Sequence, residues 1–291
     1  MTTDETEIQL RVPARPENVA LVRQALSGIG DAFAVAPGLL ADMKTAVTEA
    51  CNNVVLHAYP QSEGMLEVDA SPDDQRVAII VRDHGEGMQP KVDDADTPSL
   101  GLGLPLIATL SDRFEIHGGI GQGIEVRMLF RVNPEAVAAD MSGISSGRAP
   151  SPPPDEGPQA AGIAIIPGPV MAPVLGRMIS MLASRSDFPL DRLSDAVLMT
   201  DSISAFIDPF IPGSHALISF QDGDGTIDVW VGPLINGGAD ELLGTMDLPG
   251  LDRSLRDLAD EVKVERVSDH PDATRGAGEY LLLRLSGNTG R

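Results

Sequence analysis

Hydrophobic positions in the first half of the chain follow the periods of helices and strands in turn. Residues 34–59 carry apolar side chains at intervals of three and four, which predicts an amphipathic helix. Residues 76–83, RVAIIVRD, have the composition and spacing of a strand. A helix that runs into a strand is predicted over 106–118, and a further strand over 123–132. This half therefore mixes both kinds of element.

The second half repeats this order of elements, which indicates a tandem duplication. The helical spacing of the first half returns in residues 186–207, where Ala196 takes the place of Ala46. The strand, the helix running into a strand and the final strand follow at 226–232, 255–267 and 278–285. The matching order favours a repeat over coincidence.

Pro, Ser and Gly are concentrated between the two halves. Residues 134–162 combine these residue types with no apolar period, which predicts a solvated, partly extended linker. We therefore expect one domain at 1–133 and a second at 163–291. Because runs of strands are interrupted by helices in each, both domains are predicted to be α+β. Each would be a two-layer α/β sandwich, with a mostly antiparallel sheet and helices on one face.

Composition limits the functions open to such a chain. Lys and Arg number 21 against 43 Asp and Glu, and the net charge of −22 disfavours nucleic acid and anionic membrane surfaces as partners. The single cysteine, Cys51, excludes an internal disulfide and a cysteine-rich zinc site. An acidic start, with no apolar run long enough to span a bilayer, predicts a soluble cytoplasmic protein.

Candidate chemistry begins on the helix predicted over 34–59. Glu49 and Asn53 lie one turn apart on the flank of its apolar stripe. A carboxylate in this place can orient or deprotonate a hydroxyl nucleophile, and an amide oxygen can bind a hard cation such as Mg²⁺. Taken alone, the pair is also compatible with an exposed acid and a solvated amide on a helix surface.

Two motifs that contain glycine follow. Asp83 ends a strand and precedes Gly85 and Gly87. Its carboxylate can accept a hydrogen bond from an exocyclic amine, and the glycines let the backbone approach a flat ring. Gly101 and Gly103 open a helix whose N-terminal N–H groups suit phosphates. Each motif alone could equally be a hairpin turn or a helix cap.

Together these motifs resemble the N, G1 and G2 boxes of the Bergerat-fold (GHKL) ATPases. The stretches VPARPENVALVRQALSG and VTEACNNVVLHAY also resemble the bacterial anti-sigma-factor serine/threonine kinases, and the likeness covers residues 8–132. It implies that Glu49 is the base or orienting carboxylate, that Asn53 binds Mg²⁺ and that Asp83 binds the adenine amino group of ATP. The implied ring and lid residues are Gly85 and Gly87 beneath the adenine, and Gly101, Leu102 and Gly103 over the phosphates.

The resemblance also implies a function. The γ-phosphate of ATP would pass to a hydroxyl of a STAS-type anti-sigma factor antagonist, and the protein would also sequester a sigma factor, as in bacterial partner switching. The alternative is a non-catalytic module of the same fold, whose affinity for a partner is gated by nucleotide. A histidine-kinase core is disfavoured, because no dimerisation helix with a phosphoacceptor His precedes residue 8.

Two features of the first half depart from the family pattern. Leu100 stands before Gly101, where many relatives have a further glycine. Glu125 stands where relatives often have a Thr near the adenine-binding Asp. Both differences concern the lid and the adenine pocket, while the expected fold is unaffected.

The second half lacks the motifs altogether. In the alignment above, Met199 takes the place of Glu49, and Ile203 takes the place of Asn53. Apolar side chains cannot bind Mg²⁺ or activate a hydroxyl. Residues 163–291 are therefore expected to be a copy that has lost its site. Relatives form homodimers, and such a copy could replace the second subunit within one chain.

Overall fold

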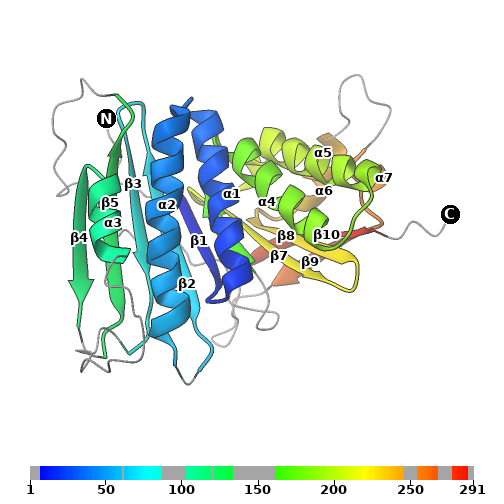
Figure 1. The fold of residues 1–291 in the computed structure, drawn as a ribbon. Helices are drawn as coiled ribbons and strands as arrows, with labels where there is room; N and C mark the ends of the chain where they lie inside the picture. The colour runs from blue at the N-terminus through cyan, green and yellow to red at the C-terminus, as the bar shows by residue number, and fades with distance from the viewer. Residues whose placement is uncertain are drawn as a thin grey trace. The chain divides into compact units, whose positions relative to one another are not determined.

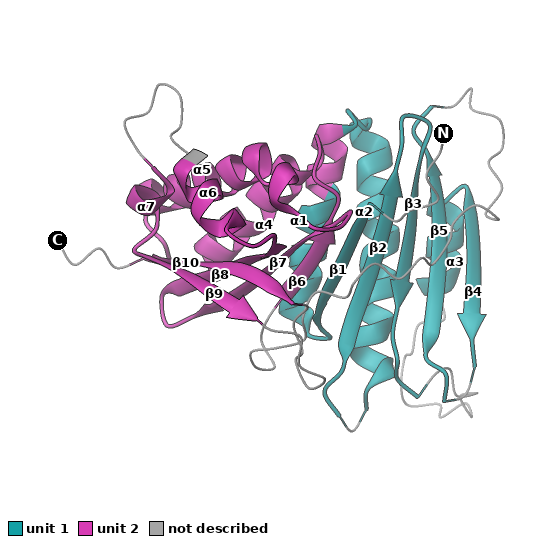
Figure 2. Ribbon diagram, turned by 180° about the vertical axis from the view of Figure 1, so that it is seen from behind, with its two compact units in different colours: residues 1–26, 33–148 teal, residues 27–32, 149–291 magenta. Residues whose placement is uncertain are grey.

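The computed structural model describes residues 7–60, 62–86, 103–119, 121–133, 161–245, 254–267 and 277–287. The chain forms two compact units (Figure 2). The first comprises Met1–Leu26 and Phe33–Arg148, and the second comprises Ser27–Ala32 and Ala149–Arg291. None of the described helices is both long enough and apolar enough to cross a membrane.

The first unit is an antiparallel sheet with helices on one face (Figure 1). Its strands pair in the order β4-β5-β3-β2-β1. The elements, in chain order, are β1 (Ile8–Pro13), α1 (Pro16–Ala32, of which Ser27–Ala32 are grouped with the second unit), α2 (Pro37–Asn53), the π-helix η1 (Val54–Ala58), β2 (Met65–Pro72), β3 (Arg76–Arg82), α3 (Gly103–Leu110), β4 (Arg113–Gly118) and β5 (Ile124–Arg131).

The core of this unit lies between α2 and the sheet. The helix begins at Pro37, where proline has no N–H that would need a partner. Its buried stripe consists of Met43, Ala46, Val47, Ala50 and Cys51. On the sheet, Val68, Val81 and Val126 lie opposite one another on neighbouring strands and are all buried. Removing these two apolar surfaces from water stabilises the two-layer arrangement.

The second unit has the same architecture. Its strands pair in the order β6-β7-β8-β10-β9, and buried Ile218, Val231 and Leu281 lie opposite one another on its sheet. The elements are β6 (Ala161–Ile165), α4 (Met171–Arg185), α5 (Leu190–Phe206), the 3-10 helix η3 (Asp208–Phe210), β7 (Ala216–Gly223), β8 (Thr226–Leu234), α6 (Gly238–Thr245), α7 (Leu255–Leu258), β9 (Glu261–Val267) and β10 (Gly278–Ser286). The α+β class and the two-layer sandwich predicted from the sequence are confirmed.

One predicted boundary differs from the structure. We expected the linker to extend to residue 162, but β6 begins at Ala161 and its five residues are all buried. The sequence AGIAI opens with Ala and Gly, which are depleted in strands, and this composition hides the start of the strand.

The alignment of the two halves is also corrected by the structure. Ala34 precedes α2 with φ 49°, and Asp187 precedes α5 with φ 55°, 153 positions further along the chain. At this spacing buried Ala46 matches buried Met199, and buried Ala50 matches buried Ile203. The alignment from the sequence used a spacing three residues shorter. An apolar helical stripe recurs every three to four residues, so a slip of that size preserves the pattern.

The corrected alignment changes which residues stand at the site positions of the second unit. Ser202 replaces Met199 as the counterpart of Glu49, and Phe206 replaces Ile203 as the counterpart of Asn53. The Ser202 hydroxyl donates a hydrogen bond to the carbonyl of Leu198 at 2.7 Å, within its own helix.

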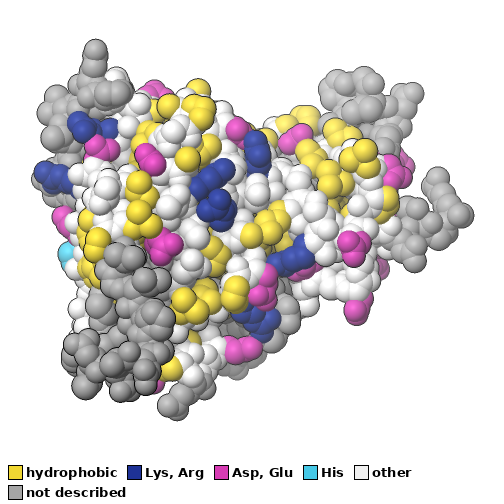
Figure 3. Space-filling model, in the orientation of Figure 1, with side chains coloured by type: hydrophobic (Ala, Val, Ile, Leu, Met, Phe, Trp, Pro, Cys, Tyr) yellow, Lys and Arg dark blue, Asp and Glu magenta, His cyan; other side chains and the backbone are white. Residues whose placement is uncertain are grey.

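The charge of the surface is mixed. On the face that Figure 3 shows, Lys and Arg are interspersed with Asp and Glu among the described residues. The described acidic side chains on this face are therefore not gathered into a single patch.

Candidate functional site

Helices α2 and α3 bring three of the predicted site residues together. Glu49 and Asn53 are half-buried on α2, and Gly103 is the first residue of α3. A Cβ atom added to Gly103 would lie 3.5 Å from Glu49 Oε2 and 3.7 Å from Asn53 Nδ2. A carboxylate, an amide and the positive end of a helix dipole thus face one small space, which a side chain at position 103 would begin to fill.

This set of donors fits a phosphate-bound Mg²⁺. The amide oxygen of Asn53 is a suitable ligand, and phosphate oxygens complete such sites in proteins. Among the described residues, no three His, Cys, Asp or Glu side chains gather where they could hold a metal ion by themselves. A bound Mg²⁺ would therefore depend on Asn53 and on the nucleotide it accompanies.

Asp83 forms the second part of the site, directly after β3. The residue is only 3% exposed. Its backbone N–H donates to the carbonyl of Ile124 at 2.9 Å, and its Oδ1 accepts a hydrogen bond from the N–H of Gly85 at 2.8 Å. Burial raises the pKa of Asp83, and the Gly85 hydrogen bond opposes that rise. The carboxylate is thus largely desolvated and held by its own loop.

Two glycines make this loop possible. A Cβ atom at Gly85 would lie 2.0 Å from the carbonyl oxygen of Ala58, and a Cβ atom at Gly123 would lie 2.2 Å from the carbonyl oxygen of Asp83. Gly123 also has φ +70°, which disfavours any other residue. We predicted Gly85 from its motif, with close approach to an adenine ring as the reason. The structure adds a contact with Ala58, and Gly123 was not predicted.

Substitution of Gly85 tests this packing. We expect Gly85→Ala to lower the free energy of unfolding by roughly 1 kcal/mol or more, because the added methyl group forces the loop away from Ala58. Gly213→Ala is the matched control, since nothing lies within 4 Å of a Cβ atom at that position, which lies outside any helix or strand. Chemical denaturation of both variants measures the difference, and equal stabilities would contradict the close contact.

Three predicted site residues cannot be placed. Gly87, Gly101 and Leu102 lie outside the described residues. Their roles beneath the adenine and over the phosphates stay predictions from the resemblance.

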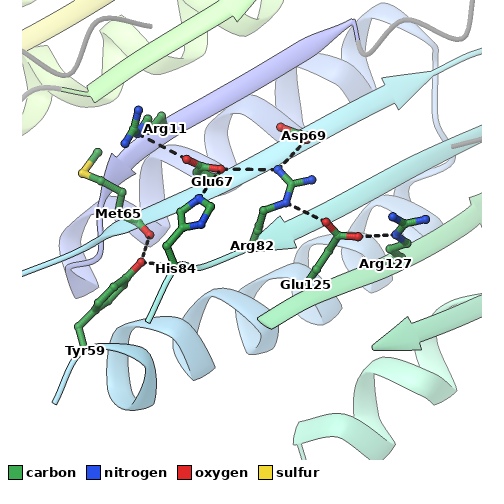
Figure 4. A network of polar contacts seen from close by, with 9 residues as sticks. All are labelled: Arg11, Tyr59, Met65, Glu67, Asp69, Arg82, His84, Glu125 and Arg127. Atoms are coloured by element: carbon green, nitrogen blue, oxygen red, sulfur yellow. Dashed lines mark hydrogen bonds and ion pairs between the residues drawn. The ribbon is translucent and has the colours of Figure 1, made fainter. Parts of the chain in front are cut away.

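The structure also adds a residue that the sequence reasoning missed. The Tyr59 hydroxyl accepts a hydrogen bond from the N–H of His84 at 2.9 Å and donates one to the carbonyl of Met65 at 2.8 Å (Figure 4). Tyr59 follows η1 directly and therefore connects the end of the α2 region to the loop that carries Asp83. The only signal in the sequence was its place in the HAY segment at the end of the helix.

An ion-pair network covers the strands beside this loop (Figure 4). Arg82 is 2.8 Å from Glu125, 3.2 Å from Asp69 and 3.6 Å from Glu67. Glu125 also accepts a hydrogen bond from Arg127 at 2.6 Å. Glu125 lies opposite Arg82 in the sheet, so its carboxylate is committed to two arginines. It does not act as a substitute for a threonine beside Asp83.

Asp69, a member of this network, makes the free energy of unfolding of the protein depend on pH. Burial raises the pKa of Asp69 to about 6, although the Arg82 guanidinium acts in the opposite direction. The unfolded value is about 3.9, so between pH 4 and 6 the native state binds more protons than the unfolded state. The free energy of unfolding therefore falls as pH rises through this window, with a contribution on the order of 2 kcal/mol.

The variant Asp69→Asn should remove this part of the pH dependence. We expect its unfolding free energy to change less between pH 4 and pH 6.5 than that of the unaltered chain in denaturant titrations. Asp74→Asn, at an exposed position on the same unit, is the control and should keep the original dependence. If the Asp69→Asn curve runs parallel to that of the unaltered chain, Asp69 is not the group that titrates.

Cys51 takes no part in the site. It is fully buried on α2, and burial raises the pKa of its thiol to about 12. A thiol in this state is a poor nucleophile at neutral pH, so Cys51 acts in packing.

Comparison with known proteins bears on the same stretch of chain. A family model described as "Histidine kinase-like ATPase domain" matches residues 12–130. The chain is 32% identical over 154 residues to the serine-protein kinase RsbW of Bacillus mycoides, which covers 49% of this chain and 95% of that protein. It is likewise 32% identical over 152 residues to the serine-protein kinase RsbW of Bacillus anthracis, with 48% and 94% covered.

A solved structure with some likeness is that of the RsbU and RsbW domains of Rv1364c from Mycobacterium tuberculosis. It is 23% identical, covers 42% of this chain and 32% of that chain, and has a TM-score of 0.34, which adds nothing to the fold described above. The two Bacillus relatives are matched over nearly their whole length. The family model covers the part of this chain that holds Glu49, Asn53 and Asp83. The chain therefore belongs to the histidine kinase-like ATPase family, among the serine-protein kinases of the RsbW type.

Proposed function

We propose that this protein is an ATP-dependent serine/threonine protein kinase of the anti-sigma type. It phosphorylates a hydroxyl of a STAS-type anti-sigma factor antagonist and sequesters a sigma factor, in the cytoplasm of a bacterium. The observation that carries the proposal is the meeting of Glu49, Asn53 and the start of α3 in one space. Family membership supports the same activity, because the relatives are serine-protein kinases.

The proposed roles follow from the chemistry of each group. Glu49 orients or deprotonates the attacking hydroxyl, since its Oε2 lies 3.5 Å from a Cβ atom placed on the first residue of α3. Asn53 binds Mg²⁺, which neutralises charge on the transferring phosphoryl group. Phosphoryl transfer depends mostly on positioning and charge neutralisation, so these two side chains and the dipole of α3 supply its main requirements.

Recognition of the base falls to Asp83 in this proposal. Its carboxylate is buried, keeps one oxygen on the Gly85 N–H, and has a second oxygen with which to accept a hydrogen bond from the adenine amino group. Gly85 and Gly87 flank the ring, and Gly101, Leu102 and Gly103 cover the phosphates.

We extend the proposal to the second unit as a copy of the first that has lost its nucleotide site. The two units share the order of their strands, and their equivalent helices follow residues with positive φ at a spacing of 153 positions. Ser202 and Phe206 stand where the first unit has its acid and its amide. Neither supplies a carboxylate or an amide oxygen, which supports a role other than ATP binding.

A phosphate transfer assay tests the proposal. The full-length chain is incubated with γ-labelled ATP and each candidate STAS-type antagonist of the same genome, and labelled serine or threonine is identified by mass spectrometry. The proposal expects one antagonist to be labelled at a single hydroxyl. ATP binding without transfer to any antagonist would instead favour the non-catalytic, nucleotide-gated module.

A further inference from the structure

The phenol of Tyr59 interrupts the ladder between two strands. In the antiparallel register of β2 and β3, Glu67 lies opposite Arg82, so Met65 would come opposite His84. The backbone of Asp83 bonds to β5, which turns the N–H of the next residue, His84, toward β2. The Tyr59 hydroxyl lies between the two strands at this place. It accepts a hydrogen bond from the His84 N–H and donates one to the Met65 carbonyl (Figure 4).

The neighbouring residue, Ala58, holds the same loop at a second point. Its carbonyl accepts a hydrogen bond from the N–H of Glu86 at 3.2 Å, and Gly85 packs directly against it. Ala58 and Tyr59 therefore accept hydrogen bonds from residues 86 and 84 of the loop. These two residues flank Gly85, whose N–H donates a hydrogen bond to the Asp83 carboxylate. The two contacts thus fix the part of the loop that holds this carboxylate.

The absence of a side chain at Gly64 leaves space for the Tyr59 ring. A Cβ atom at Gly64 would lie 2.1 Å from a ring carbon of Tyr59, so only glycine leaves room for the ring. Burial raises the pKa of the Tyr59 phenol, which keeps its proton available for the Met65 carbonyl. The hydroxyl therefore acts as donor and acceptor at once.

We propose that Tyr59 is a positioning residue for nucleotide recognition, which sets the Asp83 carboxylate where it can accept a hydrogen bond from the adenine amino group. The inference rests on the proposed ATP site and deepens it. Tyr59 follows the helix that carries Glu49 and Asn53, so one continuous segment places both the phosphate end and the base end of the site.

The test compares ATP with inosine triphosphate, whose base has an oxygen in place of the amino group. Binding of each to the full-length chain is measured by calorimetry, before and after Tyr59→Phe. We expect the variant to bind ATP about tenfold more weakly and inosine triphosphate nearly as before, so that the preference for ATP falls about tenfold. The chain has only one other tyrosine, and Tyr280→Phe, a buried position in the second unit, should leave the preference unchanged.

The outcomes separate this inference from the function beneath it. Equal weakening of both nucleotides by Tyr59→Phe would mean that the residue merely supports the fold, and would overturn the inference while leaving the ATP site in place. An unchanged preference would also overturn it. Failure of the unaltered chain to bind ATP would overturn the proposed function itself. If Tyr59→Phe does not fold, Gly64→Ala displaces the ring without removing its hydroxyl and should reduce the preference in the same direction.

Discussion

Replacing Asp83 by Asn is expected to weaken ATP binding by roughly 10- to 100-fold without unfolding the protein. The loss corresponds to one hydrogen bond to a charged group, about 1.5–3 kcal/mol. The Asn oxygen can still accept the hydrogen bond from the Gly85 N–H, so the loop keeps its shape. The new amide N–H groups cannot accept from the adenine amine. Calorimetric titration with MgATP measures the change in Kd.

The control for this prediction is the same chemical change at an exposed position. Asp74→Asn should bind ATP like the unaltered chain. If Asp83→Asn keeps full ATP affinity while remaining folded, the adenine pocket has been assigned to the wrong residue.

The second large effect is expected at Glu49. Removal of a positioned general base typically lowers the rate by roughly 10² to 10⁴. We expect Glu49→Ala to lower the rate of phosphate transfer by at least roughly 10²-fold. The variant should still bind MgATP, because Asn53 and Asp83 remain. Single-turnover transfer to the antagonist and calorimetry with MgATP separate the two quantities.

A second acidic residue of the same helix provides the comparison. Asp42 is exposed on α2, and Asp42→Ala should leave both transfer and binding unchanged. A folded Glu49→Ala protein that loses binding and transfer together would show that Glu49 is a structural carboxylate instead of a base.

The parts of the site that could be predicted from sequence are those that depend on local spacing. Glu49 and Asn53 share a helix, so a separation of four residues is enough to place them on one side of it. The resemblance implied that Gly103 belongs to the same site as these two residues. In the structure, α2 packs against α3, and this contact places Gly103 beside Glu49 and Asn53. Local patterns also sufficed for the α+β class of both units.

Tyr59 could not be predicted, because its role arises from a distant pairing. Met65 and His84 come close only once β2 and β3 have paired. No local sequence pattern indicates that the Tyr59 hydroxyl will form hydrogen bonds with the backbone of both residues. The ion pairs of Glu125 could not be predicted for a similar reason. Its partners Arg82 and Arg127 are set by the sheet register and not by the motif in which it stands.

The second unit illustrates the limit of a periodic signal. Its helix α5 was recognised from its apolar spacing, yet the alignment with α2 was three residues away from the one that burial and backbone conformation support. Periodicity identifies a helix and its buried face, whereas the identity of individual positions along it requires the tertiary contacts.

The central claim of this account is that the chain has one nucleotide site, built in the first unit around Glu49, Asn53 and Asp83. The most direct test is the stoichiometry of MgATP binding to the full-length protein at equilibrium. The account predicts one ATP per chain. Two ATP molecules per chain would contradict the loss of the site in the second unit, and no saturable binding would contradict the assignment of the site in the first.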